Sequence, residues 1–184
     1  MPTFHISLND IPPEGRTVVV DDPLVWEQPL TEFHMECRVV TPLRAEASLL
    51  PAGDGCLVRG ALSGAVIVPC DRCAEDAHVL IDHHFETFET VPEQSKDGDG
   101  NEAVENDAAY ITLEQGVPVL DLAGLCWEEF MLALPVKPLC QPNCKGLCAS
   151  CGVNLNTGAC TCPEAEGDPR LAALRAFKVK TPDH

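Results

Sequence analysis

Six cysteines lie within the 23 residues from Cys140 to Cys162, in the pattern C-x3-C-x3-C-x2-C-x8-C-x-C. Thiolates at such short separations can surround one tetrahedral cation, whereas a disulfide needs only two partners and no fixed local spacing. A chain with this array must bring several sulfurs together over a short stretch. We therefore interpret the array first as a zinc-binding element.

The segment 148–152, Cys-Ala-Ser-Cys-Gly, has the form of a zinc knuckle. Two residues between sulfurs allow a tight turn that directs both at one point, and the glycine permits the left-handed backbone that follows. The residues 153–159 contain Asn154, Asn156 and Gly158, which favour a loop that reverses direction and returns the next cysteines to the knuckle. We predict a first zinc site made by Cys148, Cys151, Cys160 and Cys162.

Two further cysteine pairs, Cys70/Cys73 and Cys140/Cys144, each supply half of a tetrahedral site and have no local complement. We predict that they complete each other across the fold as a second zinc site. Four thiolates around a zinc ion carry a net negative charge, which basic residues can offset. The basic sequence neighbours of this site are Arg72, Lys137 and Lys145.

Other uses of cysteine are less consistent with the sequence. A dithiol redox pair requires a helix start, where N–H groups lower a thiol pKa, but Cys148 follows Gly146 in a loop-forming segment. A secreted disulfide scaffold is disfavoured because no signal peptide is readable and eleven cysteines cannot all pair, so a reducing cytoplasm is expected. Three cysteines stand alone in apolar patterns and are expected in the core: Cys37, Cys56 and Cys126.

The first half of the chain has the two-residue period of β-strands. Apolar residues alternate from Phe33 to Leu49, which predicts one long strand broken at Pro42. A turn at 51–55 and a second strand with Val58, Leu62 and Val66 on one face predict a hairpin. A third strand follows the Cys70–Cys73 reversal, so that this pair lies at the tip of a β-meander, and 3–8 and 16–20 are candidate outer strands.

The second half predicts helices and one irregular segment. Asp121 can cap a helix that runs to about Leu134, with apolar residues that include Met131 at helical spacing. Residues 92–108 are acidic and are expected to form a mobile loop, and Asp168-Pro169 is typical of a helix start. The predicted fold is an α+β single domain over 1–184. It has an antiparallel β-meander body (1–91), an acidic mobile loop (92–108), and a C-terminal part (109–184) with one helix packed on the body, a cysteine-rich zinc module and a terminal helix.

Charge is distributed unevenly along the chain, whose net charge is −17. Residues 1–136 contain 25 acidic and 6 basic residues, whereas 137–180 contain 3 acidic and 6 basic residues. The body should therefore repel nucleic acid and attract a basic protein, and only 137–180 could approach phosphates. No apolar stretch reaches the length of a membrane span, so no membrane partner is expected.

Several motifs together resemble the YceD family of large ribosomal RNA subunit accumulation proteins. They are the run 132–140 (LALPVKPLC), the cysteine pattern of 144–162, the start of the last helix at 168–171 (DPRL) and the upstream CDRC at 70–73. The resemblance implies a protein needed for normal levels of large-subunit ribosomal RNA, without established catalysis. It also supports the pairing of 70/73 with 140/144, and implies that the site at 148–162 is an elaboration found in cysteine-rich members.

No nucleophile–base pair, phosphate loop or carboxylate pair is recognisable, and a closed centre of four thiolates has no open position for substrate. The leading hypothesis is a non-enzymatic, cytoplasmic, zinc-containing factor that supports ribosome assembly through a basic ribosomal protein or the pre-ribosomal large subunit. One alternative is a zinc module that contacts ribosomal RNA directly through 137–180. A second alternative is a dithiol oxidoreductase.

Overall fold

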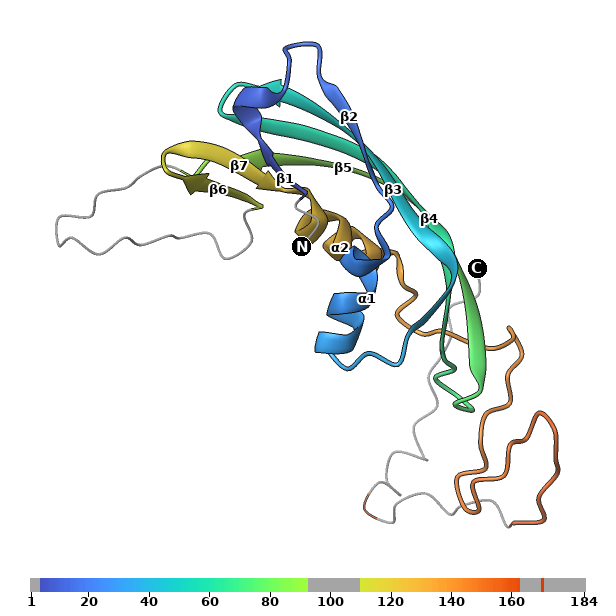
Figure 1. Cartoon of the computed structure of the whole chain (residues 1–184). Coiled ribbons are helices and arrows are strands. Elements are labelled where there is room, and N and C mark those ends of the chain that lie inside the picture. The colour runs from blue at the N-terminus through green and yellow to red at the C-terminus, as the bar shows by residue number, and fades with distance from the viewer. Residues whose placement is uncertain (1–3, 93–109, 163–169, 171–184) are drawn as a thin grey trace, which may run out of the picture.

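The computed structural model describes residues 4–92, 110–162 and 170. These residues form mainly antiparallel β-structure with two α-helices (Figure 1), in agreement with the α+β class. A four-stranded sheet contains, in spatial order, β2 (Arg16–Val20), β3 (Arg38–Ala52), β4 (Gly55–Pro69) and β5 (Asp76–Thr90). A three-stranded sheet contains β1 (His5–Ser7), β7 (Val117–Asp121) and β6 (Ile111–Glu114), and a 3-10 turn, η1 (Leu8–Asp10), follows β1.

Strands β3, β4 and β5 form the predicted meander. The β3–β4 hairpin turns between Ala52 and Gly55, and Cys70 and Cys73 lie in the reversal between β4 and β5. Alternate residues such as Leu49, Val58 and Ile81 are buried on one face. Figure 1 shows that this long sheet is curved and that both helices lie on its concave side. The core therefore sits between the sheet and the helices.

Helix α2 (Leu122–Ala133) is the helix predicted after Asp121, whose carboxylate accepts a hydrogen bond from the Gly124 N–H at 3.0 Å. Phe130 is fully buried, but Met131, which was expected on the packed face, is 39% exposed. A second helix, α1 (Pro23–Glu32), was not predicted, so the prediction of one packed helix was wrong. Trp26 of α1 meets Phe130 of α2 edge to face, with ring centroids 6.1 Å apart.

The long strand predicted from Phe33 begins only at Arg38, because α1 ends at Glu32 and residues 33–37 form the turn and connection that follow it. Phe33 ends the helix, and His34 adopts a left-handed backbone with φ of 52° that reverses the chain. Beyond Arg38 the predicted strand is present. Its expected interruption at Pro42 is also present, as register shifts between Val39 and Arg44 in the pairing with β4.

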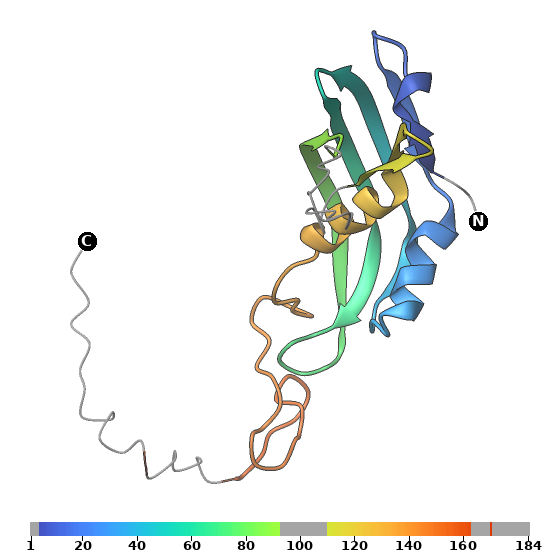
Figure 2. The same ribbon diagram turned by 90° about the vertical axis from the view of Figure 1, so that its left-hand side faces the viewer.

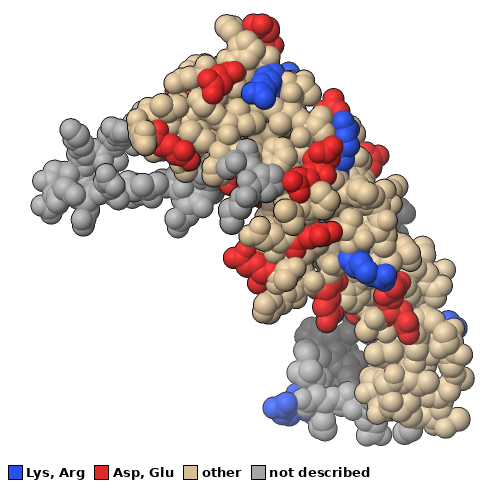
Figure 3. Space-filling model, viewed as in Figure 1, with Lys and Arg blue, Asp and Glu red and all other residues tan. Residues whose placement is uncertain are grey.

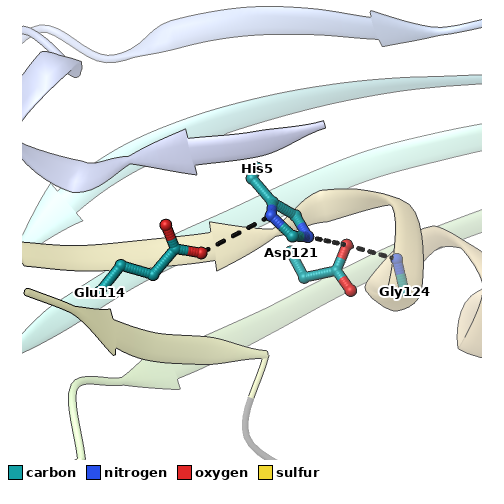
Figure 4. Close-up of polar contacts among 4 residues, drawn as sticks. All are labelled: His5, Glu114, Asp121 and Gly124. Carbon is teal, nitrogen blue, oxygen red and sulfur yellow. Dashed lines mark hydrogen bonds and ion pairs between the residues drawn. The ribbon is translucent and has the colours of Figure 1, made fainter. Parts of the chain in front are cut away.

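The small sheet is connected to α2 by polar contacts at its end (Figure 4). His5 of β1 lies 3.7 Å from the Glu114 carboxylate of β6 and 3.8 Å from the Asp121 carboxylate of β7. Asp121 also caps α2, so one carboxylate serves the strand and the helix.

Two predicted elements lie outside the described residues. They are the acidic loop of 92–108, apart from Pro92, and the terminal helix from Asp168, apart from Arg170. Among the helices of the described residues, none combines the length and the apolar character needed to cross a membrane.

Candidate metal centres

The cysteine-bearing segments meet at one end of the long sheet. In Figures 1 and 2 the chain leaves α2 and runs to the lower end of the β4–β5 hairpin, away from the small sheet. The Asp71 N–H donates a hydrogen bond to the Pro138 carbonyl at 2.9 Å, which attaches the segment after α2 to the hairpin tip. Cys140 and Cys144 thereby come beside Cys70 and Cys73.

The four sulfurs of this inner cluster converge as the sequence predicts. The Sγ atoms of Cys70 and Cys144 are 3.7 Å apart, those of Cys73 and Cys140 are 3.5 Å apart, and all four lie within 4.8 Å of one another. A zinc tetrathiolate with Zn–S bonds of about 2.3 Å has S–S edges of about 3.8 Å, whereas a disulfide bond is only about 2.05 Å long. The inner cluster therefore has the size of a tetrahedral metal site.

The outer cluster contains the other predicted set. The Sγ atoms of Cys148, Cys151, Cys160 and Cys162 also lie within 4.8 Å of one another. The Cys148 N–H bonds the Val153 carbonyl at 2.9 Å, and Leu147 forms a β-bridge with Asn154, so the loop does reverse after the knuckle. Cys151 is exposed, whereas Cys70, Cys73 and Cys144 of the inner cluster are at most 4% exposed.

The two C-x-x-C turns have the same local structure. In the inner cluster the Ala74 N–H bonds the Cys70 carbonyl at 2.9 Å, and in the outer cluster the Gly152 N–H bonds the Cys148 carbonyl at 2.9 Å. Both closing residues are left-handed, with φ of 58° at Ala74 and 72° at Gly152. Glycine adopts this conformation without strain but alanine does not, so only one of the two turns has the residue that favours it.

Backbone N–H groups in these turns stabilise thiolate. The N–H groups of Cys151 and Ser150 lower the pKa of Cys148 to about 6. Burial opposes ionisation of Cys70, but N–H groups that include those of Cys140 and Arg72 lower its pKa to about 6 as well. Each cluster thus contains at least one thiol that ionises readily near neutral pH, and a thiolate is the form that binds a cation.

One thiol in each cluster strongly resists ionisation. Hydrogen bonding to Cys73 raises the pKa of Cys140 to about 12, and hydrogen bonding to Cys151 raises the pKa of Cys162 to about 12. Like charges held this closely disfavour one another, and a divalent ion at the centre removes that penalty. Both clusters can therefore hold a metal ion.

Asn156 connects the two clusters, a role that the sequence did not reveal beyond its place in a loop. Its side-chain amide donates to Cys144 Sγ at 3.3 Å, and its side-chain oxygen accepts from the Lys145 N–H at 2.8 Å and from the Gln141 amide at 3.0 Å. Burial raises the pKa of Cys144, but the amide of Asn156 and further hydrogen bonds lower it overall. A residue of the outer loop thus supports a sulfur of the inner cluster.

Arg72 and Gly146 make the second connection. The Arg72 guanidinium donates to the Cys144 carbonyl at 2.7 Å, and the Arg72 carbonyl accepts from the Leu147 N–H at 3.0 Å. A Cβ atom at Gly146 would lie 2.9 Å from that carbonyl, and Gly146 has φ of 76°, so glycine is needed here for both space and conformation. Of the three basic residues predicted to neutralise the site, all of them described by the structure, Arg72 hydrogen-bonds within it through its charged side chain, whereas Lys145 does so through its backbone N–H.

The three remaining cysteines lie in the body, and all eleven cysteines are free thiols. Cys56 and Cys126 belong to the main hydrophobic core, and Cys37 packs against it. Burial raises the pKa of Cys126 to about 12 and raises the pKa of Cys37 and of Cys56. Cys56 and Cys126 are buried core residues, as predicted, whereas Cys37 is only partly buried.

Comparison with known proteins places the clusters in a family context. A family profile described as large ribosomal RNA subunit accumulation protein YceD matches residues 58–178, which include all eight clustered cysteines. The chain belongs to the YceD family. This YceD protein is 43% identical over 44 residues (23% of this chain and 15% of the relative) to a chloroplastic YCED homolog 1 of Zea mays, whose name also refers to large ribosomal RNA subunit accumulation.

Other relatives of this YceD protein are named as uncharacterized proteins. One from Mycobacterium tuberculosis is 28% identical over 102 residues, which is 55% of this chain and 46% of the relative. One from Mycobacterium leprae is 23% identical over 150 residues, 79% of this chain and 66% of the relative. The chain thus spans about half the length of the first curated relatives it matches, and no solved structure matches it.

Proposed function

We propose that this YceD protein is a non-enzymatic, cytoplasmic factor that holds two structural zinc ions and supports large-subunit ribosomal RNA accumulation during ribosome assembly. The observation that carries the proposal is the convergence of eight cysteines into two four-sulfur clusters within the segment matched by the family profile. Cysteine sulfur in tetrahedral sets of four is typical of structural zinc. Such an ion would neutralise the thiolates and fix the loops that carry them.

The donor sets favour a structural role over catalysis. A catalytic zinc site keeps a position for water or substrate, but four thiolates would fill the coordination sphere of each ion. A dithiol oxidoreductase is also less consistent with the structure, because Cys70 and Cys148 lie in turns rather than at a helix start. The clusters are therefore best explained as centres that fix the shape of this end of the protein.

The charge of the body favours a basic protein as the partner. Figure 3 shows acidic side chains distributed over the described surface, with few basic ones among them. Residues 1–136 contain 25 acidic and 6 basic residues, so a ribosomal RNA backbone would be repelled by most of this surface. A basic ribosomal protein, free or within the pre-ribosomal large subunit, would be attracted by the same field.

Genetic complementation tests the proposal. In cells depleted of this protein, the ratio of large-subunit to small-subunit ribosomal RNA should fall and should be restored by the wild-type gene. A Cys70→Ser, Cys148→Ser double variant, produced at equal level, should not restore it, because both centres lose a ligand. Full restoration by the variant would contradict a role for the metal centres.

Capture of the protein from cells, with and without ribonuclease, separates the two kinds of partner. A basic ribosomal protein that stays bound after ribonuclease treatment would support the proposal. The alternative is direct RNA contact through 137–180, which contains 6 basic residues. That alternative predicts that purified protein binds large-subunit RNA by itself, with an affinity that falls steeply as salt is raised.

A further inference from the structure

A small cavity lies where α1 packs beside β3, and the function proposed above does not use it. It has a volume of about 200 Å³. Binding sites for whole small molecules usually enclose roughly 300–1,000 Å³, so this cavity has room for a side chain rather than a cofactor. Its lining is mainly apolar but includes two carboxylates: Asp21, Pro23, Trp26, Glu27, Val39, Val40, Pro42 and Leu43.

The cavity borders an unpaired strand edge. β2 pairs with β3 only from Ala45 to Leu49, because the chain leaves the sheet after Val20 and turns into α1 (Figure 1). Within the described residues, β3 from Arg38 to Arg44 therefore pairs with β4 alone. Val40 on this edge is 45% exposed. An extended chain segment can lie along such an edge and place a side chain in the cavity.

The two carboxylates determine which side chain fits. Asp21 and Glu27 are exposed, and within the described part of the chain neither forms an ion pair. A lysine or arginine side chain has an aliphatic stem that suits apolar walls and a cationic head that suits carboxylates at the opening. Figure 3 shows acidic atoms over the α1 region, so the surface around the cavity also favours a positively charged side chain.

One buried donor beside the cavity is also unsatisfied. Trp26 is 1% exposed, and its indole Nε1–H has no hydrogen-bond partner within the described residues. Buried indole N–H groups normally have an acceptor, and leaving one without a partner costs about 1–3 kcal/mol. Because this N–H is sealed from solvent, Trp26 contributes to the cavity as part of its apolar wall and not as a hydrogen-bond donor to a bound segment.

A second copy of the chain is a poor occupant. The register shifts around Pro42, and the missing N–H of that proline, are features by which proteins discourage pairing between sheet edges. A regular ladder with another β3 strand would be interrupted there. A short segment anchored by one side chain does not need a regular ladder.

We propose that this cavity docks a lysine- or arginine-bearing extended segment of a basic protein partner. The choice of partner rests on the proposed function, since that function requires a basic protein. The docking geometry rests on the open edge of β3, the size of the cavity and the carboxylates of Asp21 and Glu27.

The test uses the whole chain of 184 residues, loaded with zinc, and a short blocked peptide of alternating lysine and valine. The chain contains two tryptophans, so a Trp127→Phe variant leaves Trp26 as the fluorescent reporter in the cavity wall. The peptide should bind saturably, change Trp26 fluorescence and bind more weakly as salt is raised. A peptide with glutamate in place of lysine should not bind.

Charge-neutral variants locate the binding site. Asp21→Asn with Glu27→Gln should weaken lysine-peptide binding about tenfold at low salt. The matched control, Glu14→Gln with Asp54→Asn, removes two exposed acids near the other end of the sheet and should leave binding unchanged. Val40→Lys should also block the peptide, because it places a cation beside the same carboxylates.

Several results would overturn the docking proposal. The first is an equal loss of lysine-peptide affinity in the control variant and in the cavity variant. The second is a glutamate peptide that binds as tightly as the lysine peptide, and the third is a lysine peptide that does not bind at all. The fourth is self-association of the protein that Val40→Lys abolishes. Absence of binding would mean that another part of the chain covers the cavity or that nothing basic enters it. None of these results changes the complementation test above, so failure of the cavity can be distinguished from failure of the proposed function.

Discussion

The body and the cysteine-rich end of this YceD protein differ in what holds them together. The body has one large apolar core in which Trp26 and Phe130 are at most 1% exposed. The cysteine-rich end has a separate small cluster made by Cys70, Cys73, Ala77 and Cys144, so three of its four members are candidate metal ligands. Burial of apolar surface can stabilise the body, but the other end buries too little of it to order its loops.

In the cysteine-rich end, unlike the body, the charge on the sulfurs determines whether the loops stay ordered. Its loops are joined by backbone hydrogen bonds and by sulfurs that accept N–H groups, contacts that favour thiolate. Without a cation, thiolates collected at one point repel each other. We therefore expect a bound metal ion to stabilise the fold of this end, as burial of the apolar core stabilises the body.

Removal of metal should produce the largest effect. Structural zinc contributes on the order of 10 kcal/mol to small domains, so chelation at neutral pH should disorder residues 137–162 while the body stays folded. Hydrogen exchange should become fast throughout that segment and stay slow in β3, β4 and α2. Unchanged exchange after complete metal removal would show that the hydrogen bonds alone hold the segment.

The number of reactive thiols also distinguishes the cysteine-rich end from the body. The eight clustered thiols should react with a thiol reagent after chelation, whereas the core thiols Cys56 and Cys126 should react only on unfolding. Burial raises the pKa of Cys126 to about 12 and also raises that of Cys56, so both stay protonated near neutral pH. Release of only four thiols would mean that a single metal centre exists.

The two clusters should differ in their effect when one ligand is lost. Cys144→Ser should remove the inner ion and loosen the outer loop as well, because Asn156 loses its sulfur partner at the junction. Cys151→Ser should remove only the outer ion, since Cys151 is exposed. Metal content per chain and hydrogen exchange measure both outcomes, and equal disorder in the two variants would contradict this hierarchy.

The sequence was most informative where the structure depends on the spacing of nearby residues or on the two-residue period of a strand. The C-x-x-C pairs, the meander and the Asp121 cap were predictable because each depends on neighbouring residues. Helix α1 was missed although Asp22-Pro23 is the same start signal as Asp168-Pro169. Pro29 lies inside the helix, where proline removes a backbone donor and weakens the helical pattern. Asn156 could not be assigned a role, since its partners are defined only by the tertiary contact between the loops.

Asn156 provides a smaller test of the junction. Replacement by alanine removes the donor to Cys144 Sγ and the acceptor for the Lys145 N–H, and should weaken metal binding about 10–100-fold, as loss of groups that orient metal ligands does. Competition with a zinc-binding dye at fixed pH measures the change. Asn143→Ala, an exposed control in the same segment, should have no effect, and an equal loss there would assign the effect to general loosening.

The smallest expected effect concerns the residue that closes each C-x-x-C turn. Ala74 has φ of 58°, which strains any residue with a Cβ atom, so Ala74→Gly should stabilise the folded state by less than about 1 kcal/mol after the added freedom of the unfolded chain is included. Gly152→Ala should show the reverse sign, because open space surrounds a Cβ there and only the backbone conformation opposes it. Local hydrogen exchange at each turn measures both changes. Destabilisation by Ala74→Gly would show that the methyl group contributes packing beside the inner cluster that outweighs its strain, and the apolar share of this end would then be larger than the comparison with the body implies.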